Sequence, residues 1–513
     1  MSATLWFDVE DLFHHARSST RPSGIQRVSF EIYRGLQSCF GDTGRIRFLR
    51  HAPGGYDFID VTWEELDKLF RRISGLADTE GQPPPLPAAS HWPEQSRARV
   101  VLRPLANRLP LPVRRPLVLF LVVQAQSVGA LITAATAAVL NVPALVPSVK
   151  RTPERKARAR GRVWSGFGAR HRPGRVGTTI SALVRPGDAL VVLGSPWFHG
   201  DYAELVSRLR DQLGLRFAIL IHDIIPLRRP EWCHVGIVRS FRRWHEGVLP
   251  LCDVVFANSR ATARDLEHYA RNEGLALRRP PLPVRLGTSF GLAATDHPHG
   301  DAGVTAAHDR RLPPGSYVLF VSTIEARKNH MLLFRVWRRL VEEMPTEQVP
   351  TLVFAGRIGW LVADLMQQLE NASYLDGKVV IVEEPTDAEL RTLYRGCLFT
   401  AFPSLYEGWG LPVTESLALG KPCLSSNRTS LPEAGGDLAR YFDPENLHDA
   451  TAAIRRMIEN RDALAAWESE VVRTFRHVSW EETARAIVDA LTTPDAPQSA
   501  KQVHDFPGRA IAG

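Results

Sequence analysis

The sequence has few cysteines, and no spacing that would pair them. Five cysteines occur in 513 residues, and none belongs to a C-x-x-C motif. A small, odd and scattered set disfavours both a disulfide framework and a structural zinc site. We therefore expect a reducing, cytoplasmic environment. The cysteines are Cys39, Cys233, Cys252, Cys397 and Cys423.

Two further absences restrict the function. The N-terminal stretch M-S-A-T-L-W-F-D-V-E-D has three acidic residues and no basic residue, so it does not read as a signal peptide. No aspartate cluster of the D-x-D kind stands where a divalent ion would be held. We therefore expect no metal and no cofactor, and any phosphate group would have to be bound by side-chain cations.

The net charge is +8, with arginine in excess of lysine. A basic chain suits nucleic acid, anionic lipid or a phosphorylated substrate, and arginine excess also arises from codon bias. Nucleic acid is the least favoured of these partners. The basic stretch 150–175 contains only Trp164 and Phe167 as aromatic residues, which is too few for a base-stacking platform.

Charged residues are absent from 117–149, and arginines or lysines flank this run on both sides. The run is long enough to span a bilayer. However, the strands expected near Leu5 and Phe217 should share one sheet, so both flanks must lie on the same side of a membrane, and basic flanks stay cytoplasmic. A re-entrant hairpin or an interfacial helix pair meets both conditions, and a buried helical hairpin is the alternative. We favour contact with the inner face of an anionic membrane.

Short apolar runs alternate with helical patterns, which is typical of parallel α/β units. The pattern predicts an N-terminal α/β domain over 1–290, interrupted by a helical and basic insertion at 76–180. A linker at 291–314 leads to a second α/β domain at 315–475, with a cleft between the two. A helix within 476–492 is expected to return to the first domain, and 493–513 to be a frayed tail.

Individual elements are predicted from the same alternation and from helix-start signals. The expected strands are Leu5–Val9, Arg45–His51, Ala189–Leu193, Phe217–His222, Val254–Asn258, Tyr317–Ile324, Leu352–Ala355, Val379–Glu383 and Leu398–Phe402. The expected helices are Ile25–Leu36, Tyr202–Leu213, Val238–Val248, His330–Glu343, one opened by a capping box at Thr386–Glu389, and one opened at Ser479–Glu482.

Residues 403–423, P-S-L-Y-E-G-W-G-L-P-V-T-E-S-L-A-L-G-K-P-C, place two glutamates around a glycine-rich turn. Glu407 follows a strand, at the sheet edge where α/β folds bind ligands. Glu415 is expected in the first turn of a helix that starts at Pro412, where it would accept hydrogen bonds from a diol such as ribose. The structural alternative is that Glu415 only complements the helix dipole.

A second loop between a strand and a helix holds adjacent cations. In E-A-R-K-N, Arg327 and Lys328 suit a diphosphate, which they would neutralise without metal; a solvated turn is the alternative. In the first half, S-G-I-Q-R opens a helix, and Gly24 and the helix-start amides are offered to the same phosphates. His222 ends a buried strand, where it is either structural or able to meet a sugar hydroxyl.

Taken together, these motifs resemble glycosyltransferase family 4. The glutamates at 407 and 415, E-A-R-K-N-H at 325–330 and S-L-P-E-A at 430–434 match that family's pattern in order. The resemblance is strong over about 315–490 and weaker over 1–60 and 185–290. It implies the GT-B fold, α/β with two Rossmann-like domains, and a retaining hexosyltransferase without a covalent nucleophile.

The resemblance also implies roles for particular residues. Glu407 would contact the donor sugar near its reacting carbon, and His222 would face that sugar. The donor-binding residues would be Arg327, Lys328, Glu415, Gly24, Gly410 and Leu411. Arg327 and Lys328 would stabilise the leaving diphosphate. Ser23-Gly24 replaces the glycine pair of many members, which weakens the expectation for Gly24.

The substrates are predicted from the same resemblance. S-G-I-Q-R-V resembles mannosyltransferase-like members, which suggests GDP-mannose as the nucleotide-sugar donor. A membrane-docked chain suggests a lipid-linked oligosaccharide or polysaccharide acceptor, as in assembly of bacterial surface polysaccharides. The alternatives are a soluble transferase acting on a small acceptor and a non-catalytic scaffold or nucleic-acid-binding protein.

Overall fold

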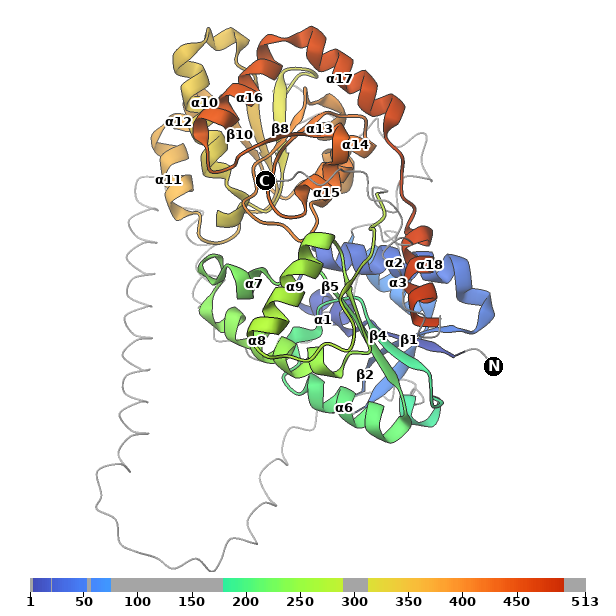
Figure 1. Cartoon of the computed structure of the whole chain (residues 1–513). Coiled ribbons are helices and arrows are strands. Elements are labelled where there is room, and N and C mark those ends of the chain that lie inside the picture. The colour runs from blue at the N-terminus through green and yellow to red at the C-terminus, as the bar shows by residue number, and fades with distance from the viewer. Residues whose placement is uncertain (1–2, 20, 53–56, 75–178, 289–311, 493–513) are drawn as a thin grey trace, which may run out of the picture. The chain divides into compact units, whose positions relative to one another are not determined.

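A computed structural model describes residues 3–19, 21–52, 57–74, 179–288 and 312–492 (Figure 1). The prediction for the uncharged run at 117–149 lies outside these residues. So does nearly all of the predicted insertion and linker, and the whole predicted tail.

The N-terminal domain is built on one sheet of seven strands in the order β3-β2-β1-β4-β5-β6-β7. Its strands are β1 (Leu5–Asp8), β2 (Ile46–His51), β3 (Phe58–Val61), β4 (Ala189–Val192), β5 (Arg216–Ile221), β6 (Val254–Ala257) and β7 (Leu282–Pro283). All neighbours are parallel except β2 and β3. Every residue of β1 and β4 is buried, as expected for strands covered by helices on both faces.

The C-terminal domain has a sheet of six parallel strands in the order β10-β9-β8-β11-β12-β13. They are β8 (Tyr317–Val321), β9 (Thr351–Ala355), β10 (Val379–Val382), β11 (Thr400–Phe402), β12 (Cys423–Ser426) and β13 (Arg440–Phe442). The predicted α/β class with two Rossmann-like domains is confirmed, and it is the architecture of the GT-B fold.

The helices of the N-terminal domain are α1 (Glu10–Ser18), α2 (Gly24–Phe40), α3 (Trp63–Ile73), α6 (Tyr202–Leu213), α7 (Ile225–Arg228), α8 (Val235–Val248) and α9 (Arg260–Asn272). After β8 come α10 (His330–Glu343), α11 (Ala363–Asn371), α12 (Ser373–Asp376), α13 (Asp387–Gly396), α14 (Leu411–Ala418), α15 (Leu431–Gly435), α16 (Leu447–Glu459), α17 (Arg461–Thr474) and α18 (Trp480–Thr492).

The strand order reverses at one point in each sheet, between β1 and β4 and between β8 and β11. Chain segments leaving the carboxyl ends of two such strands turn to opposite faces of the sheet and leave a crevice between them. In the C-terminal domain these two segments carry the predicted cation pair and Glu407.

Several helix starts were predicted accurately from the sequence. The capping box at Thr386 and Glu389 forms with both reciprocal hydrogen bonds. A second box, Thr62 with Glu65, opens α3 and was not predicted. The strand Phe58–Val61 before it was also missed, because an antiparallel edge strand of four residues gives little periodic signal.

The last helix packs on the N-terminal domain. α18 lies along α2 (Figure 1), and a side chain at Gly35 of α2 would stand 2.6 Å from the carbonyl oxygen of Trp480. The Thr483 hydroxyl donates a hydrogen bond of 2.8 Å to the carbonyl of Arg285. The chain therefore crosses from the second domain back to the first through residues 475–480.

Within the described ranges we find no helix that combines the length and the apolar character needed to cross a bilayer.

Candidate active site

The predicted cations and Glu407 meet because their loops leave neighbouring strands. A 3₁₀ turn, Ala326–Lys328, follows β8, and Glu407 follows β11. Asn329 closes the turn in the left-handed conformation, with φ of 61°. Its side-chain amide donates to the carbonyls of Pro403 (3.3 Å) and Pro444 (2.9 Å), which ties the two loops together.

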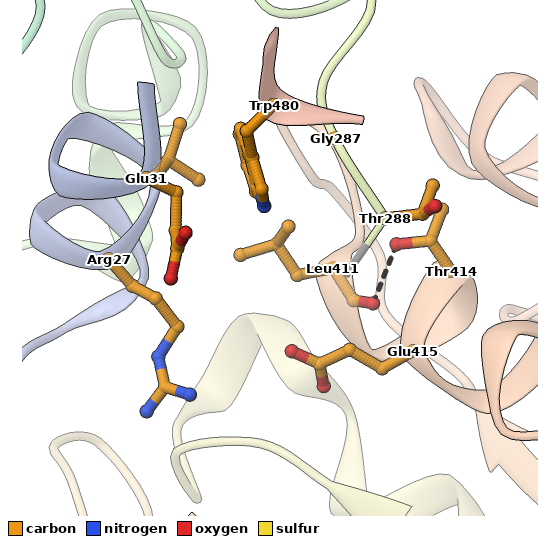
Figure 2. Close-up of a pocket in the computed structure, with 9 residues that line it drawn as sticks. Arg27, Glu31, Gly287, Thr288, Leu411, Thr414, Glu415 and Trp480 are labelled. Carbon is orange, nitrogen blue, oxygen red and sulfur yellow. Dashed lines mark hydrogen bonds between the residues drawn. The ribbon is translucent and has the colours of Figure 1, made fainter. Parts of the chain in front are cut away.

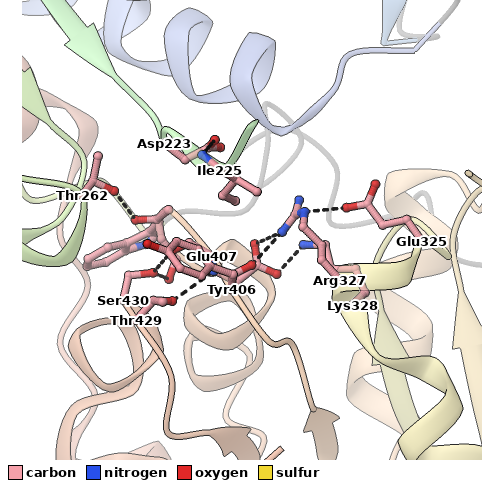
Figure 3. Close-up of polar contacts among 12 residues, drawn as sticks. Asp223, Ile225, Thr262, Glu325, Arg327, Lys328, Tyr406, Glu407, Thr429 and Ser430 are labelled. Carbon is pink, nitrogen blue, oxygen red and sulfur yellow. Dashed lines mark hydrogen bonds and ion pairs between the residues drawn. The ribbon is translucent and has the colours of Figure 1, made fainter. Parts of the chain in front are cut away.

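Both carboxylate oxygens of Glu407 are paired with cations (Figure 3). Oε1 lies 2.5 Å from Lys328 Nζ, and Oε2 lies 2.7 Å from the Arg327 guanidinium. Glu325 holds the other side of Arg327 at 2.8 Å. The side chains of Glu325, Glu407 and Lys328 are nearly buried, with at most 11% of their surface exposed, and that of Arg327 is 21% exposed.

The charges in this cluster are strongly coupled. Burial alone would raise the pKa of Glu407, but Arg327 and Lys328 outweigh it and lower the pKa to about 2. Burial and the neighbouring Arg327 lower the pKa of Lys328. Glu407 is thus ionised at neutral pH, and it pairs with both cations that were predicted to meet a diphosphate.

The backbone around Glu407 is fixed by two hydroxyl side chains (Figure 3). The Glu407 amide donates to Thr429 Oγ1 at 3.0 Å. Ser430, which is fully buried, donates to the carbonyls of Glu407 and Trp409, each at 2.9 Å. These contacts set the direction of the Glu407 side chain before any ligand arrives.

His222 was predicted to be the last residue of a strand, but β5 ends one residue earlier, at Ile221. Its Nε2 is 2.8 Å from the carbonyl oxygen of Leu193. A carbonyl only accepts, so Nε2 carries the proton, and burial lowers the pKa of His222 so that the ring is neutral. Nδ1 then presents a lone pair, which suits a sugar hydroxyl as donor.

Glycines bring the two domains together at this point. A side chain at Gly408 would collide with the His222 carbonyl oxygen, at 2.0 Å, so only glycine permits this approach. Gly410 has φ of 111° and precedes Leu411, the first residue of α14. At Gly24 the nearest atom to an added side chain is Leu411 Cδ1, 3.8 Å away, so this glycine leaves space between the domains.

Glu415 lines a pocket formed by α2, α14, the start of α18 and the segment after β7 (Figure 2). Its Oε2 accepts a hydrogen bond of 3.0 Å from the Tyr394 hydroxyl. Burial raises its pKa, while Arg27 lowers it. The prediction that Glu415 lies in the first helical turn was wrong, because α14 begins at Leu411 and its first turn contains no acidic residue. This disfavours the alternative in which Glu415 serves the helix dipole. The pocket is lined by Arg27, Val28, Glu31, Gly287, Thr288, Leu411, Thr414, Glu415 and Trp480.

Arg27 is a residue of this site that sequence reasoning missed. Its guanidinium makes two hydrogen bonds to Asp387 of α13, at 2.8 and 3.1 Å, and its charge also acts on Glu415. Arg27 stands in the S-G-I-Q-R segment and Asp387 in the predicted capping box, but no local pattern marks the two residues as partners.

The amino end of α9 is held by the C-terminal domain. Glu433 of α15 accepts hydrogen bonds from the backbone amides of Arg260 and Ala261, both at 2.8 Å. Thr262 donates to the carbonyl of Gly408 at 3.3 Å, next to Glu407. A glutamate at a helix start satisfies free N–H groups and complements the dipole.

We expect Glu433→Gln to destabilise the protein by about 1 kcal/mol or more, because a neutral amide replaces a charged acceptor at the end of α9. Thermal unfolding would measure the change. Glu459→Gln, at the exposed end of α16, is the matched control. Equal midpoints for the two variants would contradict the capping role.

The reversal point of the N-terminal sheet holds a buried carboxyl group. Asp11 follows β1 and lies against Gly194 after β4, where any side chain would stand 2.1 Å from the Asp11 carboxyl. Burial and the nearby Asp8 raise the pKa of Asp11 to about 7. The folded chain therefore binds a proton here that the unfolded chain releases above its ordinary pKa of about 4.

This raised pKa predicts a pH dependence of stability. The contribution is full below pH 4 and is lost as pH rises through about 7. At pH 8 we expect the free energy of unfolding of Asp11→Asn to exceed that of wild type by up to about 4 kcal/mol, and its midpoint temperature to be higher. Near pH 4 the two proteins should be equally stable. Asp42→Asn, on an exposed turn, is the control. An unchanged pH profile in Asp11→Asn would refute the assignment.

Residues 310–471 match the family model "Glycosyl transferases group 1". This part of the chain is a group 1 glycosyltransferase domain. It contains both glutamates and both cations of the candidate site.

Curated relatives of the group 1 domain and its flanks include two Escherichia coli proteins. The chain is 25% identical to "Serotype-specific mannosyltransferase WbdA" over 342 residues, which are 65% of this chain and 40% of that protein. It is 25% identical to "O-antigen chain mannosyltransferase B" over 295 residues, 57% of this chain and 73% of that protein. The chain thus spans about two fifths of the length of WbdA.

Among solved structures, an α,α-trehalose-phosphate synthase (UDP-forming) from Burkholderia xenovorans superposes with a TM-score of 0.48 and 16% identity. The superposition covers 61% of this chain and 74% of that one.

Proposed function

We propose that the chain is a retaining glycosyltransferase that moves a hexose from a nucleotide-diphosphate donor to a glycan acceptor. The observation that supports it most directly is the contact of Glu407 with Arg327 and Lys328 at the strand reversal of the group 1 domain. A buried lysine and a partly exposed arginine at that edge suit the diphosphate of the donor.

The pairing of Glu407 favours a mechanism without a covalent sugar–enzyme intermediate. Both of its oxygens are engaged, and its pKa near 2 makes it a weak nucleophile. In the proposed reaction the diphosphate leaves the anomeric carbon while Arg327 and Lys328 stabilise the charge on its oxygens. The acceptor oxygen attacks from the same face, and its proton passes to the leaving phosphate.

The other site residues would hold the donor. His222 Nδ1 would accept a hydrogen bond from a hydroxyl of the transferred sugar, and Glu415 would accept from the ribose diol. The backbone amides of Gly410 and Leu411, at the start of α14, would bind donor oxygens, and Gly24 would leave room for the diphosphate. The cations replace a metal ion in this scheme, so we propose that neither a metal nor a cofactor is needed.

We propose GDP-mannose as donor and a lipid-linked oligosaccharide or polysaccharide as acceptor. Two relatives are named as mannosyltransferases, one of them of an O-antigen chain, and the S-G-I-Q-R-V segment points the same way. The acceptor would be reached at the inner face of a membrane, with the uncharged run 117–149 as one contact with the bilayer.

The test is a calorimetric titration of the purified chain with GDP, UDP, ADP and their sugar conjugates, without divalent metal. We expect one nucleotide to bind clearly and its affinity to collapse in Glu415→Ala. Glu370→Ala, on the exposed face of α11, is the matched control. No binding of any nucleotide to a well-folded chain would refute the proposal and favour a non-catalytic scaffold.

A further inference from the structure

Large apolar side chains are exposed together at one place among the described residues. The five most exposed are Val235, Ile358, Trp360, Leu361 and Val472. Four of these lie on two short segments, the start of α8 and the loop between β9 and α11. The Trp360 indole donates a hydrogen bond of 2.9 Å to the carbonyl of Trp232, which joins the two segments. We call Trp232, Val235, Ile358, Trp360 and Leu361 the rim patch.

The rim patch is continuous with the candidate site. Ile358 forms a β-bridge with Ile324, the residue before Glu325 of the cation loop. The Gly359 amide donates to the Ile324 carbonyl at 2.9 Å, and a side chain at Gly359 would press on that loop. On the other segment, Cys233 lies close enough to Arg327 and Glu325 for their charges to act on its thiol. The patch therefore borders the place where the reaction is proposed to occur.

Neither packing nor backbone preference explains the residues of this loop. Leu361 is 60% exposed and Trp360 is 49% exposed. Leu361 also has φ of 57°, a conformation in which glycine or asparagine is favoured over leucine. A chain selected for solubility and low strain alone would place a small polar residue here. This combination points to an external surface that the leucine and tryptophan meet.

Unpaired arginines surround the rim patch. Val235, Arg239 and Arg243 recur at intervals of four on the exposed face of α8. Arg357 precedes Ile358 and is exposed as well. None of these three arginines forms an ion pair with another described residue, whereas the neighbouring Arg229 is neutralised by Glu231 at 2.6 Å. One exposed acid, Asp364, follows the loop.

We infer that the rim patch and these three arginines dock the chain on an anionic lipid bilayer, beside the mouth of the active site. Tryptophan and aliphatic side chains insert at the bilayer interface, and arginines beside them attract anionic headgroups. A protein partner would also cover an apolar patch, but it would not require unpaired cations around it. The inference rests on the proposed function for its purpose, because a lipid-linked acceptor must reach Glu407 from the bilayer.

The test measures sedimentation of the full chain with phosphatidylcholine vesicles, with and without phosphatidylglycerol. We expect binding that depends on phosphatidylglycerol and weakens as salt is added. Arg239→Gln with Arg243→Gln should weaken it by about fivefold for each charge removed. Trp360→Ser with Leu361→Ser should weaken it by about tenfold or more.

Val472→Ser is the matched control, because Val472 is 67% exposed on α17 and belongs to no patch. Vesicle binding of both double variants at the level of Val472→Ser would overturn the inference, as would binding indifferent to phosphatidylglycerol. Nucleotide affinity, measured in the same variants, should equal that of wild type. A wild-type chain that binds vesicles through the rim patch but binds no nucleotide would refute the proposed function and leave the docking surface standing.

Discussion

Glu407→Gln is expected to lower the turnover of sugar transfer by about a hundredfold to a thousandfold, as removal of a single preorganised electrostatic group does in other enzymes. In the structure this carboxylate lies 2.5 Å from Lys328 Nζ and 2.7 Å from the Arg327 guanidinium. The amide keeps the size of the side chain but loses its charge. The cations would then lack the group that orients them toward the sugar and its diphosphate.

Binding of the nucleotide should respond in the opposite sense. Without the Glu407 charge, Arg327 and Lys328 are less neutralised, so the affinity for a nucleoside diphosphate should stay equal or rise. Calorimetry with the nucleotide and a turnover assay on the same preparation would separate the two effects. If Glu407 had only a structural role, its replacement by glutamine would lower nucleotide affinity and turnover together.

A loss of turnover in Glu407→Gln must be distinguished from a loss of folding. Removing one partner of a buried ion pair costs up to about 3–5 kcal/mol, so thermal unfolding must show that Glu407→Gln is folded. Glu407→Asp keeps the charge on a shorter side chain and serves if the glutamine variant is unstable. Glu342→Gln, 67% exposed on α10, should behave as wild type. Turnover close to wild type in a folded Glu407→Gln would exclude Glu407 from catalysis.

Arg327→Ala is expected to weaken nucleoside-diphosphate binding by about tenfold to a hundredfold. That range corresponds to the roughly 1.5–3 kcal/mol of hydrogen bonds to charged groups. The effect should be larger for the diphosphate than for the monophosphate, because the cation loop after β8 is proposed to meet the leaving group. Calorimetric titrations with both nucleotides measure this difference directly.

Arg327→Lys tests the geometry as well as the charge. A lysine supplies one positive charge without the planar fork, so it should recover part of the diphosphate affinity. Arg338→Ala, on the following helix α10 and 58% exposed, is the matched control. Equal affinity in Arg327→Ala and wild type would remove Arg327 from the donor site and leave Lys328 as its only cation after β8.

Short-range patterns in the sequence predict much of the local structure of this protein. Strands buried on both faces, such as Ala189–Val192, need continuous apolar runs, and these are visible in the sequence. Helix starts need particular side chains at fixed spacing, as at Thr386 and Glu389. The alternation of the two, with the motif around Glu407 and Glu415, was enough to predict two parallel-sheet domains and the family resemblance.

What the pattern missed depends on contacts between distant residues. Arg27 and Asp387 are 360 positions apart, and nothing local marks them as partners. The same holds for Glu433 at the start of α9, and for the short antiparallel strand Phe58–Val61. Each becomes visible only when separate segments are brought to one sheet edge or one helix end.

Sequence alone determined most of the central strands, several helix starts and the α/β architecture of the two domains, because burial and capping act over a few residues. Tertiary structure decided how the residues at the strand ends are paired. Strand order placed β8 beside β11, so the cations that were predicted to bind a diphosphate are paired with Glu407. A buried charge without a partner is strongly destabilising, so it pairs with an opposite charge nearby. Which opposite charge is nearby depends on the topology of the sheet rather than on position along the chain.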